Sequence, residues 1–414
     1  MSQRALEHAA LSPARFTSFL IKGSPPGEPL PPFSTRILEA RFLHISDENN
    51  QDSRKFRDFF LVPGGRFFIT ESPETIDIWD LGFSPEEVIR PYPLASLEIM
   101  TDKSLLMCNV TPDGSELRMI VATMEEDTVL VEVSIYHVDP SSSNPAFLLV
   151  ANLENLNVGL NCYSSSENLF AFCDESGIIV WNFVDDSISS WDCGNEISGC
   201  SLLHDHIILF NLHGFSVYKL PLFLPRIDKT IPLSPPDVCG CPTLRLSYAS
   251  HQPPVSVLLP FGSWAADVNV SPQFSVILVH DTTARNATIE EYSSISYNDP
   301  LNRGFPNLVP ALMNLARSSV PIDWQGGSRI CNGHTVYMWA SDADYVENIA
   351  VFLSPICTRP LASRCDTPIS HAATLWASTS VNTIQAFDLC PTSGRLCVMT
   401  SMKEIRIVDY LAPF

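Results

Sequence analysis

A short strand-like segment recurs along the chain, and this repetition restricts the possible folds more than any other feature. Its clearest copy is "IDIWDL", Ile76–Leu81, with the form apolar, any, apolar, aromatic, polar, apolar. The aromatic and polar positions of seven candidate copies are Trp79-Asp80, Tyr136-His137, Trp181-Asn182, Tyr218-Lys219, Tyr292, Trp339 and Val408-Asp409. Their mean separation is about 55 residues. Repeats of roughly 40–50 residues that each supply four strands are typical of β-propeller blades.

Most copies follow another apolar strand and a polar turn. In the first, Arg66–Thr70 and Ile76–Leu81 are rich in β-branched and aromatic residues, and the polar Glu71–Glu74 joins them as a hairpin loop. A four-stranded blade cannot bury both faces alone, so blades stack radially and their strands become largely apolar. We therefore predict an all-β chain folded as a β-propeller of seven blades. Six or eight blades are alternatives because the longest gaps can each hold another blade, and a β-sandwich is the second architecture.

The two ends of the chain carry the signal for ring closure. "RLCVMTS" and "EIRIVDYL" are the last strands, and the chain ends three residues after Leu411. We expect them to share a blade with the early strand Arg36–Ile45. The chain thus divides into an N-terminal helix and Pro-rich linker, residues 1–32, and a propeller, residues 33–414.

The N-terminal segment predicts one helix. Ser12-Pro13 is a favourable start, because Ser caps free N–H groups and Pro fits the first helical position. Phe16, Phe19 and Leu20 then share one apolar face. We expect this face to dock on the ring; the alternative is that it is the remnant of a lost helical module. Gly23 is a natural stop. A second short helix is expected within Pro306–Ser319, inside one of the insertions between blades.

Composition excludes some classes of function. The chain of 414 residues has 25 Lys and Arg against 46 Asp and Glu, a formal charge of −21. An acidic surface repels nucleic acid and anionic membranes, so neither is an expected partner. The N-terminus lacks the apolar core of a secretory signal, and no run reaches the roughly 18 apolar residues of a membrane span. We expect an intracellular protein, cytoplasmic or nuclear. Its 12 cysteines then include small buried hydrophobes such as Cys108, Cys173 and Cys397.

Motifs that name a reaction are missing from the sequence. There is no Gly-x-Gly-x-x-Gly, Gly-x-x-x-x-Gly-Lys, Gly-x-Ser-x-Gly or His-Glu-x-x-His. His204-Asp205-His206 with the nearby His213 could bind a metal, but a polar strand start is the favoured interpretation. Zinc could be held by four cysteines together, Cys239, Cys241, Cys357 and Cys365, but loop or core thiols are favoured there. The acidic segments Met124–Thr128 and Cys173–Gly177 fit solvated turns, although Asp174 and Glu175 can line one rim. Trp79, Trp181 and Trp339 fit the core. We therefore assign no catalytic, cofactor-binding or metal-ligating residue, and no cofactor.

Two segments carry a resemblance to a known family. "LVPGGRFFITESPETIDIWDLG" and "FDLCPTSGRLCVMTSMKEIRIVDYL" resemble the first and last blades of the C-terminal propellers of F-box proteins from mushroom-forming fungi, which are degenerate WD-repeat propellers. The likeness covers about residues 12–414. It departs from the standard WD repeat, because Gly333-His334 is the single Gly-His dipeptide and lacks a matching Trp-Asp. An F-box of about 40–50 residues is not evident, since residues 1–32 predict one helix and a linker.

The resemblance implies a non-enzymatic scaffold that binds another protein, in the context of substrate recognition for an F-box ubiquitin ligase, with ligase components as possible partners. The alternative is a propeller enzyme or a ligand-binding protein with a site in the central channel. An acidic, His-rich channel would favour the enzyme, whereas an apolar, aromatic rim would favour the scaffold.

Overall fold

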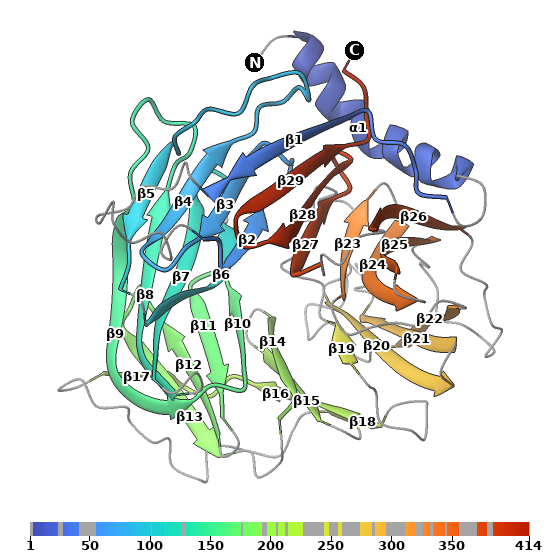
Figure 1. The fold of residues 1–414 in the computed structure, drawn as a ribbon. Coiled ribbons are helices and arrows are strands. Elements are labelled where there is room, and N and C mark those ends of the chain that lie inside the picture. Colours follow the sequence, from blue (N-terminus) through green and yellow to red (C-terminus); the bar gives the residue numbers. More distant parts are fainter. Residues whose placement is uncertain are drawn as a thin grey trace.

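The fold is a ring of antiparallel sheets with one long helix on its periphery (Figure 1). The computed structural model describes residues 3–23, 28–40, 55–100, 102–111, 113–125, 129–174, 177–192, 197–203, 206–211, 214–226, 244–247, 256–258, 274–283, 286–294, 311–318, 326–331, 334–343, 346–355, 371–378 and 384–413.

The described strands form seven sheets, which we number in ring order. Sheet 1 contains β2 (Asp58–Leu61), β3 (Phe67–Glu71), β4 (Thr75–Asp80) and β5 (Ala95–Glu98). Sheet 2 contains β6 (Lys103–Val110), β7 (Leu117–Glu125), β8 (Val129–Val138) and β9 (Leu148–Gly159). Sheet 3 contains β10 (Cys162–Ser166), β11 (Leu169–Cys173), β12 (Gly177–Asn182), β13 (Ser187–Asp192) and the short β17 (Leu224–Pro225). Sheet 4 contains β14 (Gly199–Leu203), β15 (His206–Asn211), β16 (Gly214–Lys219) and β18 (Leu244–Ser247).

The remaining three sheets complete the ring. Sheet 5 contains β19 (Ser256–Leu258), β20 (Phe274–Thr283), β21 (Asn286–Ser294) and β22 (Ala311–Ser318). Sheet 6 contains β23 (Gly326–Cys331), β24 (His334–Ala343), β25 (Val346–Pro355) and β26 (His371–Ser378). Sheet 7 contains β27 (Ala386–Cys390), β28 (Arg395–Ser401), β29 (Glu404–Asp409) and, as its outermost strand, β1 (Ser34–Glu39). In sheets 1 to 6 the innermost strand comes first in the chain (Figure 1).

The two ends of the chain meet in sheet 7, as the sequence predicts. β1 pairs antiparallel with β29 in a register that runs from Ser34 opposite Asp409 to Glu39 opposite Glu404. The predicted closing strand is confirmed for Arg36–Glu39, and residues 41–45 lie outside the described residues. The last sheet of the ring is therefore completed by the first strand of the chain.

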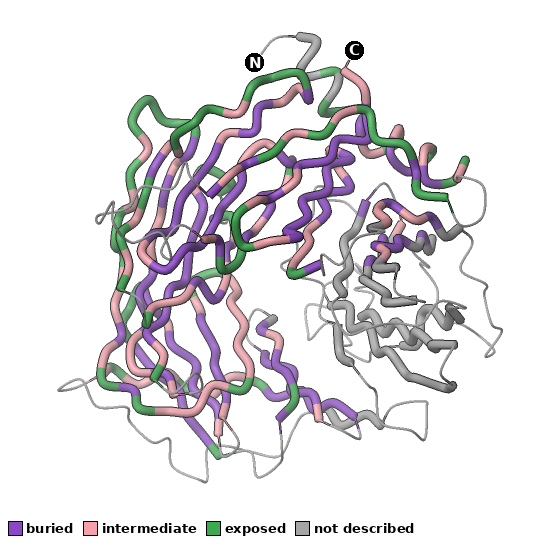
Figure 2. The backbone as a smooth tube through the Cα atoms, in the orientation of Figure 1, coloured by how far each residue is buried: buried purple, intermediate pink, exposed green. Residues whose placement is uncertain are grey.

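The core lies between neighbouring sheets rather than inside any one of them. One buried cluster joins sheets 7 and 1, with Phe68 and Trp79 facing Met399 and Ile407. Further clusters join sheets 1 and 2, sheets 2 and 3, and sheets 3 and 4. Figure 2 shows this burial as purple in the strands between the inner and outer edges of the sheets. Because each sheet buries its faces against its neighbours, the ring is stable only when closed.

The helix α1 (Gln3–Lys22) is longer than the sequence predicts, and its expected start was wrong. Pro13 lies inside the helix. The preceding segment "QRALEHAAL" is rich in strong helix formers, which outweigh the single hydrogen bond that Pro13 removes. The predicted end is confirmed: Gly23 has φ of +65° and its N–H donates to the carbonyls of Phe19 and Leu20.

The predicted apolar face of α1 docks on the ring. Phe16 and Leu20 are 0% and 2% exposed in a cluster that joins sheets 6 and 7, and Phe19 is packed against it. The Tyr410 ring lies 6.3 Å from that of Phe16, and its hydroxyl donates to Leu375 O at 2.6 Å. The helix therefore packs across the boundary between sheet 6 and sheet 7.

Two further expectations were wrong. Residues 311–318, expected within a helix, form β22, because pairing with β21 satisfies backbone groups that local helix propensity would leave unpaired. Six of the seven recurring segments lie on the third strand of a sheet, but Trp339 lies on β24, the second strand of sheet 6. The third strand there is β25, whose segment "IAVFLS" departs from the repeated form.

The packing of α1 on sheets 6 and 7 predicts that two substitutions on this helix differ greatly in their effect on the free energy of unfolding. Phe16→Ala opens a cavity between sheets 6 and 7 and should lower the free energy of unfolding by about 3–5 kcal/mol. Leu11→Ala, at a position 50% exposed on the same helix, should change it by less than about 1 kcal/mol. Denaturant unfolding followed by circular dichroism measures both. Equal effects would show that α1 does not hold the closure.

Candidate functional site

The contact of β1 with the β28–β29 hairpin, which we call the closing seam, is built around one buried carboxylate. Asp409, at the end of β29, pairs with Arg36 of β1 at 2.9 Å and with Arg395 of β28 at 2.6 Å. The side chains of Asp409 and Arg395 are 6% and 3% exposed. One carboxylate thus joins the first strand of the chain to its last hairpin. Two hydrogen-bonded cations offset the cost of burying it.

Arg395 also ties sheet 7 to sheet 1. Its guanidinium donates to the carbonyl of Gly65, in the β2–β3 turn, and to that of Gly82 at 3.1 Å. A second arginine makes the same kind of contact elsewhere in the ring. Arg118, near the start of β7 in sheet 2, donates to the carbonyl of Glu167 in the β10–β11 turn of sheet 3. An arginine at the start of a second strand therefore clamps the first turn of the next sheet.

The approach of Gly65 to sheet 7 requires glycine. Gly65 has φ of +70°, and a Cβ there would collide with Ser393 Oγ. Its neighbour Gly64 has φ of +86°, but a Cβ there would meet nothing within 4 Å. The two glycines share a left-handed backbone, and only Gly65 also needs the absence of a side chain.

A rim segment, residues 81–94 between β4 and β5, lies directly beside this seam. Arg36 Nη1 donates to the carbonyls of Leu81 at 2.6 Å and Glu87 at 3.0 Å. The Glu87 carboxylate in turn accepts the N–H groups of Phe83 at 3.1 Å and Ser84 at 2.8 Å. The same arginine that helps to close the ring thus also fixes the shape of this rim segment.

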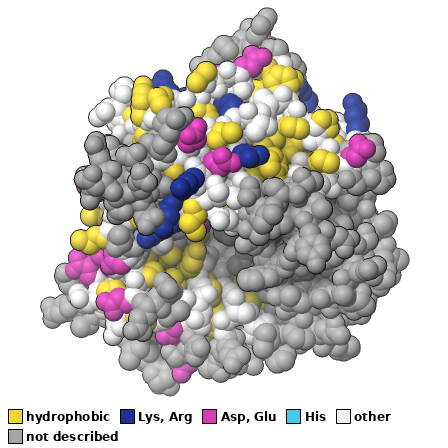
Figure 3. Space-filling view, viewed as in Figure 1, with side chains coloured by type: hydrophobic (Ala, Val, Ile, Leu, Met, Phe, Trp, Pro, Cys, Tyr) yellow, Lys and Arg dark blue, Asp and Glu magenta, His cyan; other side chains and the backbone are white. Residues whose placement is uncertain are grey.

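The rim segment displays apolar and aromatic side chains on that fixed backbone. Ile89 packs inward on the core between sheets 7 and 1. Val88 and Tyr92 are 90% and 59% exposed, and Arg90 between them is exposed. In Figure 3, hydrophobic side chains lie at the surface beside charged ones on this side of the ring. Tyr and Arg side chains beside apolar ones on an ordered backbone are typical of protein-binding hot spots.

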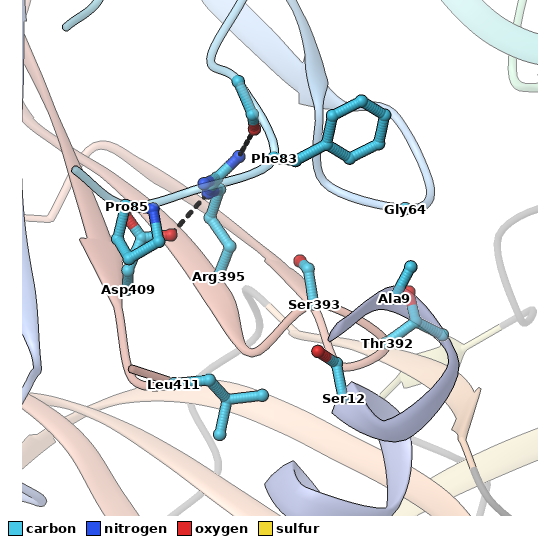
Figure 4. A pocket seen from close by; sticks show the side chains of 11 residues that line it. Ala9, Ser12, Gly64, Phe83, Pro85, Thr392, Ser393, Arg395, Asp409 and Leu411 are labelled. Atoms are coloured by element: carbon cyan, nitrogen blue, oxygen red, sulfur yellow. Dashed lines mark hydrogen bonds and ion pairs between the residues drawn. The ribbon is translucent and has the colours of Figure 1, made fainter. Parts of the chain in front are cut away.

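A small pocket lies between α1 and the seam (Figure 4). Its volume is about 80 Å³, room for two or three waters at about 30 Å³ each. Arg395 and Asp409 form one wall, the Ser12, Thr392 and Ser393 side chains line it beside them, and the remaining lining residues are Ala9, Gly64, Gly82, Phe83, Pro85 and Leu411. Pockets for small organic ligands are usually 300–1,000 Å³, so this one suits waters or the tip of one side chain.

Carboxylates and a hydroxyl near the centre of the ring bind backbone amides of the next sheet. Asp388 on β27 accepts the N–H of Leu61 at 3.0 Å, and Glu71 accepts that of Leu105 at 3.0 Å. Ser164 on β10 accepts the N–H of Leu202 at 3.0 Å. Each contact pairs an innermost-strand amide with the preceding sheet, so these groups serve structure.

Burial perturbs the acidic groups in this region. It raises the pKa values of Asp58 and Glu71 above their ordinary range, against the lowering effect of the N–H groups that each carboxylate accepts. The pKa of the Tyr163 hydroxyl is also raised, first by burial and then by the charges of Asp58 and Glu71. These three neighbouring side chains with raised pKa values are the observation that most favours a channel enzyme. The two carboxylates are, however, already engaged by backbone amides of Phe59 and Leu105.

The candidate residues of the sequence lie in the following places. Trp79 and Trp181 are each 1% exposed, and Cys108, Cys173 and Cys397 are buried, so their predicted core positions are confirmed. Asp174 accepts the N–H of Gly177 at 2.7 Å in a turn, and His206 is buried on β15. The following lie outside the described residues: His204, Asp205, His213, Glu175, Cys239, Cys241, Cys357 and Cys365. The side chain of Trp339 is likewise not described.

Sequence reasoning missed the seam and the rim segment beside it. One signal was present: "GGR" directly before β3 and "SGR" at the start of β28 place an arginine near the start of the second strand in two sheets whose third strand ends in Asp. In sheet 1 that pair is Arg66 with Asp80, at 2.8 Å. The carbonyls that Arg395 binds in the neighbouring sheet leave no sequence signal, because any residue supplies a carbonyl.

Comparisons with known proteins support the fold. The Neurospora crassa Pan2 WD40 domain superposes with a TM-score of 0.51 at 7% identity, covering 94% of this chain and 98% of that one. A chain from the structure of ctPRC2 in complex with H3K27me3 and H3K27M gives a TM-score of 0.53 at 10% identity, covering 94% and 99%. No family model and no curated protein matches the sequence. At these identities the likeness shows the fold alone, a WD-repeat-like β-propeller.

One helix is present among the described residues, and neither it nor any other described segment forms a helix long and apolar enough to cross a membrane.

The seam predicts different costs for two neighbouring glycines. Gly64→Ala should cost about 1–2 kcal/mol of stability, the strain of a left-handed backbone with a Cβ. Gly65→Ala should cost about 1–3 kcal/mol more, since the new methyl group also displaces Ser393. Thermal or denaturant unfolding compares the two variants. If Gly65→Ala is no worse than Gly64→Ala, the close contact of sheets 1 and 7 is not as described.

Proposed function

We propose that this chain is a non-enzymatic scaffold that binds another protein through the rim segment, residues 81–94. The observation that carries the proposal is the exposure of Val88 and Tyr92, 90% and 59%, on a backbone held by Arg36, Glu87 and the inward-packed Ile89. A binding loop that is already ordered loses little entropy on association.

We propose the following organisation for the scaffold. Residues 33–414 form a propeller of seven blades, one for each sheet, and residues 1–32 form an N-terminal helix and linker that dock against it. The protein is intracellular, cytoplasmic or nuclear. The pairing of β1 with β29 and the burial of Phe16 support this division of the chain.

We further propose that the partner is a substrate of a ubiquitin ligase, and that the chain is a recognition propeller related to F-box receptors. Support comes from the two segments that resemble such propellers, which fold as the neighbouring sheets 1 and 7. The rim segment belongs to the first of these sheets and is anchored by Arg36 of the other. The first resembling segment ends at Gly82, and the candidate contact residues Val88 and Tyr92 follow shortly after it in the same sheet connection.

The channel enzyme remains the second candidate, because Asp58, Glu71 and Tyr163 have raised pKa values in one region. Structural use of the carboxylates weighs against it. Glu71 holds both the N–H of Leu105 and the hydroxyl of Ser104, and a group so engaged is not free to exchange protons with a substrate without breaking the contact between sheets 1 and 2.

The binding proposal predicts loss of capture by a rim variant. Val88→Asp combined with Tyr92→Ala should weaken the partner's binding by about 2 kcal/mol or more, roughly 30-fold in Kd. Tagged wild-type and variant chains are compared by affinity capture and quantitative mass spectrometry, and the Kd is then measured with the purified partner. Leu148→Asp, at an exposed position on the outer strand β9, is the matched control and should retain the partner.

The proteins captured by wild type and by the rim variant distinguish a ligase receptor from a scaffold without a ligase role. Ligase adaptor and cullin among the proteins captured by wild type, with substrates lost in the rim variant, would support a ligase receptor. Partners captured without ligase components but lost in the rim variant would support the scaffold and contradict the ligase role. Identical capture by wild type and the rim variant would contradict the rim as the binding surface.

A further inference from the structure

Three cysteine side chains from two neighbouring sheets converge at one point. Cys162 on β10 lies opposite Cys173 on β11 in sheet 3, and Cys200 on β14 joins them from sheet 4. Their sulfur atoms all lie within 4.8 Å of one another. Within the part of the chain that the structure describes, this is the one group of three or more His, Cys, Asp or Glu side chains with ligand atoms so close together.

Two of the three cysteines are buried in an apolar cluster, and the third is partly exposed. Cys173 and Cys200 are each 0% exposed and belong to a hydrophobic cluster that includes Ala171 and Ile207. Cys162, on the innermost strand of sheet 3, is half-buried. Cys162 is thus the least buried of the three, so an ion would approach from its side, and the buried Cys173 and Cys200 thiols would complete the site from the apolar side.

The donor set points to a particular class of ion. Soft thiolate ligands select Cu(I), Zn(II) and iron–sulfur clusters. Structural zinc takes four protein ligands, and common iron–sulfur clusters are held by four cysteines. Among the described side chains, no histidine, carboxylate or fourth cysteine belongs to this group. Cu(I), which accepts three sulfur ligands, is the ion that this set satisfies without a further donor.

We propose that Cys162, Cys173 and Cys200 bind one Cu(I) ion as three thiolates. Each thiol releases its proton to solvent as its sulfur–copper bond forms, and copper stays in the +1 state, so no electron acceptor is needed. The bound ion links sheet 3 to sheet 4. It adds a second link across the boundary at which the Ser164 hydroxyl already accepts the N–H of Leu202.

The experiment uses the purified chain of 414 residues, reduced and kept free of oxygen. Cu(I) is supplied as its complex with a coloured chelator, and the loss of chelator colour gives the amount transferred. Wild type should withdraw one Cu(I) per chain at the tightest site. Cys200→Ala and Cys173→Ala should weaken that site at least about 100-fold, more than the usual effect of changing a residue that only supports a metal ligand.

The control separates this site from the chain's other cysteines, of which there are 12 in all. Cys108→Ala removes a buried thiol of sheet 2 outside the group and should keep the tight site. Circular dichroism verifies that each variant is folded, and Cu(I) should raise the thermal midpoint of wild type and Cys108→Ala but not of Cys200→Ala. Transfer of no Cu(I) to wild type, equal transfer to Cys200→Ala, or preference of the site for Zn(II) over Cu(I) would each overturn the proposal.

Discussion

Ring closure by pairing of β1 with β29 is the interaction on which the rest of the structure depends. The core lies between sheets, so each sheet needs a neighbour on both sides. Sheet 7 obtains its outermost strand from the start of the chain. The Asp409 carboxylate, held by Arg36 and Arg395, then joins the first strand to the last hairpin, and Arg395 reaches on to the turn of sheet 1. Closure thus combines backbone pairing, a buried ion-pair group and packing of α1 in one region.

The candidate docking surface follows from the same constraint. Arg36 is needed for closure, and its second set of contacts fixes the base of the rim segment. A rim loop that depends on the closed ring presents Val88 and Tyr92 only when the fold is complete. The backbone of the rim segment is held in one conformation and is kept from pairing with other strands. This restraint is a physical reason why an acidic protein tolerates the exposed apolar side chains of the segment.

The sequence predicted the repeated strands, the closing strand and the apolar face of α1, because each depends on periodicity within one segment. Ile76–Leu81 carries the whole signal for its strand, and Phe16, Phe19 and Leu20 define one helix face by spacing alone. Residues 311–318 escaped prediction because pairing with β21 decides their structure. The seam escaped because Arg395 binds backbone carbonyls more than 300 residues away. The three cysteines escaped because they come from three strands of two sheets.

A disulfide across the closing pair tests this account most directly. Ile37 lies opposite Arg406, at a position without direct backbone hydrogen bonds, where Cα atoms are about 4.5 Å apart and cysteines can bridge. Ile37→Cys with Arg406→Cys should form that disulfide on mild oxidation, detected in peptides by mass spectrometry. Ile37→Cys with Glu404→Cys, a diagonal pair about 7–8 Å apart, should not. Bridging of the diagonal pair in place of the direct pair, or of neither, would contradict closure by β1 and β29 in this register.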